Sequence, residues 1–245
     1  MYIDRIQIDR SQLERDTEDS YVFELPALRS LETLALKKKV TFLVGENGTG
    51  KSTLLEAIAV AYGFNPEGGS RNFQFSTSKS YSELYRAIRF VKSAFPKDGF
   101  FLRAESFYNL ATNLDELDAV RAPAPKLCSS YGGKSLHKQS HGESFFALLL
   151  NRFGGKGLYL LDEPEAALSP ARQLTMLAQM NQLVKKDSQF IIATHSPILM
   201  AYPDAEILLL DETGIHQTAY EQTEHYQITK EFLNHPERML CELLD

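Results

Sequence analysis

Hydrophobic residues along this chain gather in short runs that end at polar or glycine-rich turns. Runs of this length with few polar interruptions are typical of strands that are buried on both faces of a sheet. The strands predicted in this way cover residues 40–44, 99–103, 157–161, 189–194 and 205–210. Residues 2–8 instead alternate between apolar and polar positions, as a strand with one buried face would. Residues 21–25 give a further strand candidate, which Pro26 would end.

Helical patterns separate several of these strands. The predicted helices cover residues 54–61, the apolar segment from residue 145 through Phe153, the segment after Pro170 that carries Leu174 and Leu177, and residues 228–244, where Pro236 interrupts the pattern. Strands that alternate with helices in this way predict an α/β fold.

The segment from Ser70 to Arg103 differs in character from the rest of the chain. It carries seven basic and two acidic residues, a net charge of +5, whereas the whole chain has a net charge of −6. Its apolar residues at helical spacing are Leu84, Ile88, Val91 and Phe95. Ser80 or Ser82 would cap this helix, and Arg86, Arg89 and Lys92 lie off its apolar stripe. The basic face is either solvated or contacts nucleic acid.

Length and composition limit the domain organisation. A chain of 245 residues with 43% hydrophobic content can bury one substantial core, so we expect a single domain over residues 1–245. Approximately residues 70–140 are expected to form a small inserted helical subdomain. The charged N-terminus has no signal-peptide pattern, and the apolar runs are too short to span a membrane. With only Cys128 and Cys241, the sequence predicts a soluble, cytoplasmic protein without a disulfide framework.

The stretch Gly-Glu-Asn-Gly-Thr-Gly-Lys-Ser-Thr at residues 45–53 matches G-x-x-x-x-G-K-[ST]. The strand predicted before it and the helix predicted after it are the context that a phosphate-binding loop requires. The glycines let backbone N–H groups converge on phosphates, and a helix N-terminus adds positive potential. The residues expected to bind nucleotide are Gly45, Asn47, Gly48, Thr49, Gly50, Lys51, Ser52 and Thr53. Lys51 would reach the β- and γ-phosphates and the Ser52 hydroxyl would bind Mg²⁺, so the chain is predicted to bind a nucleoside triphosphate.

Further features follow this loop in a characteristic order. Ser140-x-Gly142 precedes a helix, a buried strand ends in Asp162-Glu163, and the next strand ends at His195. This order resembles that of the ATP-binding-cassette ATPases. The chain is similar to their soluble branch, which is related to chromosome-maintenance and double-strand-break-repair ATPases, and more closely to compact stand-alone bacterial ATPases of the AAA-labelled, cassette-like type. The resemblance implies a P-loop NTPase with an ABC-type ATPase head, a mixed core sheet and a small inserted helical subdomain.

The resemblance also implies roles for individual residues. Asp162 would hold Mg²⁺, usually through a water, and Glu163 would orient and deprotonate the attacking water. His195 resembles the switch histidine of the family, which contacts the γ-phosphate and positions the water. Lys51 would offset charge on the same phosphate. Glu165 is assigned a structural role.

Two positions depart from the family pattern. The signature, usually Leu-Ser-Gly-Gly-Gln, here reads Gln-Ser-His-Gly-Glu at residues 139–143, so His141 and Glu143 are unusual. Glu143 would need a compensating cation near phosphate. The glutamine expected to help bind the metal is replaced by Glu105, with Gln74 as a rival candidate. By resemblance, Ser140 and Gly142 face the γ-phosphate bound to the opposite subunit of an ATP-dependent homodimer.

Three functions fit these observations. The sequence favours the first, a soluble ABC-type Mg-dependent ATPase that acts in DNA repair, nucleic-acid surveillance or defence, with DNA or a protein as partner. The second is the nucleotide-binding subunit of a membrane transporter, against which the altered signature and Glu105 count. The third is an ATP-dependent regulatory binding module. Sustained heptads are absent from the sequence, which argues against a long coiled-coil tether. Tyr21 or Phe23 would either stack on a base or belong to the core.

Overall fold

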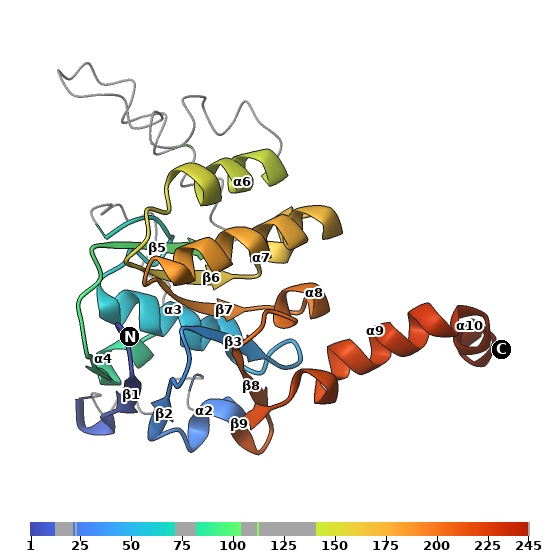
Figure 1. Ribbon diagram of the computed structural model, residues 1–245. Helices are drawn as coiled ribbons and strands as arrows, with labels where there is room; N and C mark the ends of the chain where they lie inside the picture. The colour runs from blue at the N-terminus through green and yellow to red at the C-terminus, as the bar shows by residue number, and fades with distance from the viewer. Residues whose placement is uncertain (13–21, 23, 72–81, 104–111, 113–140, 245) are drawn as a thin grey trace.

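The predicted buried runs assemble into a six-stranded sheet in the order β5-β6-β7-β3-β8-β9 (Figure 1). Its strands are β3 Val40–Val44, β5 Asp98–Arg103, β6 Gly157–Asp162, β7 Gln189–Ala193, β8 Glu206–Asp211 and β9 Gly214–Thr218. All neighbouring pairs are parallel except β8 and β9, so the sheet is mixed. The computed structural model describes residues 1–12, 22, 24–71, 82–103, 112 and 141–244. The strands predicted from apolar runs are confirmed, whereas the mostly polar β9 was missed.

A second, antiparallel sheet has the order β2-β1-β4. Its strands are β1 Arg5–Ile8, β2 Thr33–Ala35 and β4 Ile88–Val91. The prediction of one helix through Leu84, Ile88, Val91 and Phe95 is therefore wrong, because helix α4 stops at Ala87. Ile88 takes up extended backbone and begins a ladder in which it faces Ile8 of β1. Pairing with the edge of β1 supplies the backbone hydrogen bonds that a longer helix would have made.

The expected inserted subdomain covers both described and undescribed residues. Residues 82–103 form α4 Leu84–Ala87, β4 and β5, and so belong to the two sheets. The predicted cap by Ser82 is wrong, because the N-cap of α4 is Glu83, without a side-chain cap. The Ser82 hydroxyl instead accepts a hydrogen bond from Leu84 N at 3.2 Å in the turn before the helix. Residues 72–81, 104–111 and 113–140 lie outside the described residues, and for them the subdomain remains a prediction.

The strand predicted over residues 21–25 is also wrong where the chain is described. Leu25 precedes the short helix α2 Pro26–Arg29, and neither Glu24 nor Leu25 is in a strand. Proline at the first helical position has its φ angle preset for a helix, so Pro26 begins a helix here and does not end a strand. Tyr21 and Phe23 lie outside the described residues, so base stacking by either remains a prediction.

Helices cover both faces of the large sheet (Figure 1). On one face, α3 Lys51–Tyr62 packs with the small sheet against alternate strand residues such as Leu43 and Ile191. On the other face, α6 His141–Asn151 and α7 Pro170–Lys185 pack against the intervening residues, such as Phe42. Successive strand residues point to opposite faces, so each strand contributes to both hydrophobic cores. The helix that follows the phosphate loop and the helix that follows the signature thus lie on opposite sides of the sheet.

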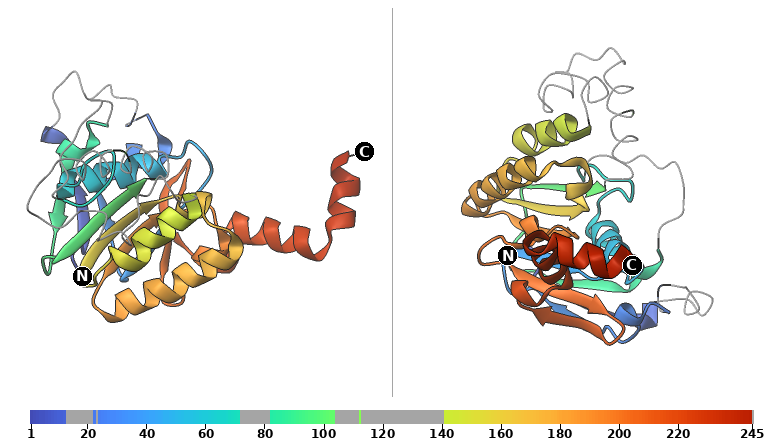
Figure 2. Two further views of the ribbon diagram at one scale, coloured as in Figure 1. Left: turned by 90° about the horizontal axis from the view of Figure 1, so that it is seen from above. Right: turned by 90° about the vertical axis from the view of Figure 1, so that its right-hand side faces the viewer.

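The chain ends in two helices, α9 Glu224–Asn234 and α10 Pro236–Leu244, which we call the C-terminal arm. Figure 2 shows the arm extending away from the rest of the domain. Neither helix contains a buried residue. The predicted helical tail interrupted at Pro236 is confirmed, and α9 begins earlier than predicted because the Thr223 hydroxyl caps it.

The remaining short elements are η1 Arg10–Gln12, η5 Pro164–Ala167, α8 Pro197–Met200 and η6 Tyr220–Gln222. Among the helices that the structure describes, none is both long and apolar enough to cross a membrane.

Candidate functional site

The phosphate loop joins β3 to α3 through backbone conformations that favour glycine. Gly45, Gly48 and Gly50 have φ angles of 145°, 83° and 100°. A Cβ atom on Gly45 would overlap the backbone carbonyl oxygen of Leu210 in β8, so a side chain there would push the loop away from the neighbouring strand. The sequence therefore places glycine where the loop must pass closely over the sheet edge.

Lys51 begins α3 and turns back over the phosphate loop. Its Nζ donates hydrogen bonds to the carbonyl oxygens of Gly45 and Glu46, both at 2.7 Å, and the residue is only 5% exposed. Burial lowers the pKa of Lys51, while the nearby carboxylates of Glu163 and Asp162 act in the opposite direction. The ammonium group is thus held where phosphates bound by the loop N–H groups would meet it.

A cavity of about 250 Å³ opens beside the loop. Its lining residues are Leu25, Asn47, Gly48, Gly50, Lys51, Ser52, Thr53 and Glu163. Most of them were predicted to bind nucleotide from the loop motif. Leu25 was not, because no local pattern indicates that the residue before α2 would reach this cavity.

Ser52 and Asp162 come together although they lie on different elements. The Ser52 hydroxyl in α3 donates to Oδ1 of Asp162, at the end of β6, at 2.9 Å. Asp162 is 6% exposed, and its Oδ2 lies 3.9 Å from Nε of Arg103. Hydroxyl and carboxylate oxygens are ligands that Mg²⁺ accepts, and this ion commonly uses few protein ligands together with phosphate oxygens. The pair therefore fits the predicted metal site.

Glu163 and His195 approach each other from the ends of adjacent strands. Glu163 has a φ angle of 48°, in the left-handed region, and its N–H donates to the carbonyl of Ala193 at 2.9 Å. Its Oε1 lies 3.7 Å from Nε2 of His195. Left-handed backbone costs a non-glycine residue about 1–3 kcal/mol and is found most often at functional sites. The turn directs the carboxylate into the cavity beside the loop.

The backbone of His195 is held by Glu165. Oε1 of Glu165 accepts a hydrogen bond from the His195 N–H at 2.6 Å. Burial raises the pKa of Glu165, and the hydrogen bond from His195 opposes that change. This contact agrees with the structural role that was assigned to Glu165.

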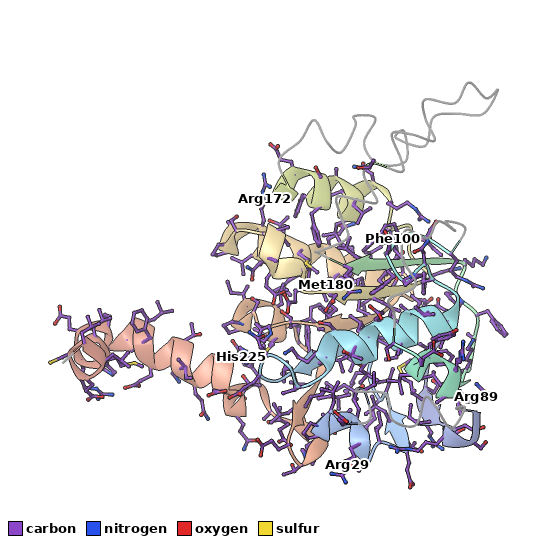
Figure 3. The ribbon with its side chains drawn as sticks, turned by 180° about the vertical axis from the view of Figure 1, so that it is seen from behind. Arg29, Arg89, Phe100, Arg172, Met180 and His225 are labelled. Atoms are coloured by element: carbon purple, nitrogen blue, oxygen red, sulfur yellow. The ribbon has the colours of Figure 1, made fainter. Side chains whose placement is uncertain are left out.

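The ring of His195 has a partner that sequence reasoning missed. Its Nδ1 lies 2.8 Å from Nε2 of His225, in the first turn of α9, and the ring centroids are 5.0 Å apart. Figure 3 shows His225 at the base of the C-terminal arm, where α9 meets the domain. Burial lowers the pKa of both rings, and the charge of Lys51 lowers them further. No sequence signal points to this pair, because the two histidines are separated by thirty positions of unrelated pattern.

The signature segment is only partly described. Gly142 lies in α6, and a Cβ atom on it would come 2.5 Å from Nη1 of Arg172 and 2.7 Å from the carbonyl of Ala167. Arg172 in α7 therefore places a cation beside the signature helix (Figure 3). Ser140, Glu105 and Gln74 lie outside the described residues, as does the side chain of His141. The structure thus brings together Lys51, Ser52, Asp162, Glu163 and His195, and places Gly142 on a helix across the sheet.

Two family models match parts of the chain that carry the site. The model described as "AAA domain" matches residues 23–99, and the model described as "AAA domain, putative AbiEii toxin, Type IV TA system" matches residues 143–201. The tungstate uptake system ATP-binding protein TupC of Peptoclostridium acidaminophilum is 30% identical over 78% of this chain and 88% of its own. An uncharacterized ABC transporter ATP-binding protein of Haemophilus influenzae is 29% identical over 72% of this chain and 71% of its own.

Solved structures were also matched. CbiO1 from Clostridium perfringens, part of an ABC transporter complex, has a TM-score of 0.47 and 17% identity over 96% of this chain and 97% of its own. The SMC head domain from Thermotoga maritima has a TM-score of 0.43 and 15% identity over 89% of this chain and 98% of its own.

The sequence relatives and the family models define the class of protein. The chain belongs to the ATP-binding-cassette ATPases, and its fold is that of a P-loop NTPase. It is an ATPase.

Proposed function

We propose that the chain hydrolyses Mg-ATP at a site shared between two copies of itself. The observation that carries this proposal is that Lys51, Ser52 and Glu163 line one cavity. Asp162 accepts a hydrogen bond from Ser52, and His195 lies 3.7 Å from Glu163, while the signature helix α6 lies on the other side of the sheet. The catalytic groups of one chain therefore meet at one edge of the sheet, and its signature would serve the site of another chain.

Each side chain has a role in this reaction. The loop N–H groups and Lys51 would hold the β- and γ-phosphates. Ser52 and Asp162 would bind Mg²⁺, which when bound offsets the negative charge of the phosphates. Glu163 would accept a proton from the attacking water, and His195 would hydrogen-bond the γ-phosphate from the next strand. Glu163 Oε1 and His195 Nε2 are 3.7 Å apart, so both groups could contact the attacking water and the γ-phosphate at the same time.

The second copy would complete the site. A phosphate loop contacts its nucleotide from one side and leaves part of the γ-phosphate exposed. A second helix N-terminus can add positive potential at that phosphate only if it approaches across an interface. The start of α6, with Ser140 and Gly142, would supply that terminus. Arg172, packed beside Gly142, is the cation that would compensate Glu143 there.

Complementation tests the shared site. Ser140→Arg protein and Lys51→Ala protein should each be inactive alone, because neither chain can form an intact site with a copy of itself. Mixing them in equal amounts allows a mixed dimer in which one of the two sites is intact, so turnover should return, to at most about half of the wild-type rate. Light scattering should show Ser140→Arg as a monomer with and without ATP. Full activity from a wild-type protein that stays monomeric in ATP would overturn the shared site.

For the wider role, we infer that the chain drives a membrane transporter. The relatives that support this are named as ATP-binding subunits of transporters. The basic helical face that would have favoured nucleic acid is not formed, because α4 ends at Ala87 and Arg89 lies in β4. Arg86 pairs with Glu83 at 2.8 Å.

A defence role is the second candidate, since the model matching residues 143–201 is described as a toxin–antitoxin domain. A pull-down with ATP-bound Glu163→Gln protein separates the two. Capture of an integral membrane protein would support the transporter, whereas turnover stimulated by linear duplex DNA, without membrane capture, would support the defence role.

A further inference from the structure

Of the two ring nitrogens of His195, one has a hydrogen-bond partner among the described residues and the other has none. Nδ1 lies 2.8 Å from Nε2 of His225. Nε2 has no hydrogen-bond partner among the described side chains, although it lies 3.7 Å from Oε1 of Glu163. Glu165 meanwhile fixes the backbone N–H of the same residue. The main chain and one edge of the ring are therefore anchored, and the free edge points toward the proposed general base.

Only one proton can lie between the two imidazole nitrogens. Burial and the charge of Lys51 lower the pKa of both rings; Glu163 opposes this at His195, and Glu224 opposes it at His225. Both rings are then neutral near pH 7, and each carries a single N–H. If Nδ1 of His195 holds the proton, its Nε2 can only accept a hydrogen bond. If Nε2 of His225 holds the proton instead, the proton of His195 lies on its own Nε2.

The surroundings of Nε2 decide between these two arrangements. A carboxylate oxygen of Glu163 faces this nitrogen, and the γ-phosphate would offer further acceptors. Acceptors favour a donor, so the arrangement with N–H at Nε2 of His195 is the one that satisfies the site.

We propose that His225 is a positioning residue, whose Nε2–H donates to Nδ1 of His195 and so keeps the Nε2–H of His195 directed at Glu163 and the γ-phosphate. The inference rests on the proposed function of His195. It also means that the first turn of the C-terminal arm takes part in ATP turnover, although the arm itself buries no residue.

Two substitutions test the proposal. His225→Leu removes the donor, and kcat should fall by about 10- to 100-fold with little change in KM, since the ring of His195 loses its orientation but the phosphate loop is intact. His225→Gln offers an amide N–H close to the position of Nε2 and should restore most of kcat. His235→Leu, at the other end of α9, is the matched control and should turn over like wild type.

A spectroscopic measurement reads the proton directly. In ¹⁵N-histidine NMR spectra, wild-type His195, assigned with a His195→Ala sample, should show the tautomer protonated at Nε2, and His225→Leu should lose that preference. The inference is overturned if wild-type His195 is protonated at Nδ1, if His225→Leu keeps kcat within about twofold, or if His225→Gln is as slow as His225→Leu.

Turnover of His195→Ala distinguishes a failure of the proposed function from a failure of this inference. If His195→Ala turns over at the wild-type rate, the role of His195 itself is wrong and this inference falls with it. If His195→Ala is slow while His225→Leu is fast, only the role of His225 is wrong.

Discussion

We call the end of the large sheet that carries Lys51, Asp162 and Glu163 the phosphate-binding edge. This edge and the C-terminal arm differ in how tightly the fold holds them. At the edge, Lys51 and Asp162 are almost fully buried and hydrogen-bonded across elements. In the arm, α9 and α10 have no buried residue, and large apolar side chains such as Leu233 and Leu243 are exposed. The edge is therefore fixed by the core beneath it, whereas within the described part of the chain the arm is fixed at its base.

The two regions meet at one point. Thr223 caps α9 and is itself buried, and two residues later His225 contacts His195. The proposed role of His225 therefore lies where the arm joins the domain, and the predictions below separate the edge from the arm.

The largest effect should come from the edge. Glu163→Gln keeps the shape of the side chain but removes the proton acceptor, so turnover at saturating ATP should fall by about 10²–10⁴. ATP binding should persist because Lys51 and the loop are unchanged. Glu221→Gln, an exposed carboxylate at the base of the arm, is the control and should have no effect. Steady-state phosphate release measures both; near wild-type turnover by Glu163→Gln would show that the base is another residue.

The sequence predicted the edge well because its information is local. The loop motif fixes the spacing of Lys51 and Ser52, and Asp162 and His195 each follow a buried apolar run. Because the carboxyl ends of parallel strands meet at one edge of a sheet, such residues gather without further signals. Five of the six strands of the large sheet were predicted for the same reason, since they are apolar runs, whereas the mostly polar β9 was missed.

What the sequence did not predict depends on tertiary contacts. Ile88 to Val91 fits both a helical and an extended pattern, and only the edge of β1 selects the strand. Leu25 lines the cavity because α2 packs nearby, and His225 reaches His195 because α9 starts beside it. Neither position has a periodicity that marks it. A single sequence therefore does not predict which side chains from distant elements reach a site.

An intermediate effect is expected from the loop backbone. Gly45→Ala should lower the free energy of unfolding by about 1–3 kcal/mol, because the new methyl group combines a left-handed φ angle with overlap of the Leu210 carbonyl. Gly48→Ala is the matched control. The φ angle of Gly48 is also positive, but nothing lies within 4 Å of the added atom, so the decrease in the free energy of unfolding should be smaller. Urea denaturation compares them. Equal losses would mean that backbone conformation alone, and not the close approach to β8, sets the requirement for glycine.

The smallest effect should come from the tip of the arm. Leu243 is 72% exposed, so Leu243→Ser should change the free energy of unfolding by no more than about 0.5 kcal/mol, as at other surface positions. Leu54→Ala, in the core beneath the phosphate loop, should by contrast cost about 2–5 kcal/mol. Urea denaturation at two protein concentrations tests both. If Leu243→Ser cost more than about 1 kcal/mol, and more at the higher concentration, the arm would be covered by a second copy and would not be free. The contrast between a fixed edge and a loosely held arm would then apply to the isolated chain and not to its assembly.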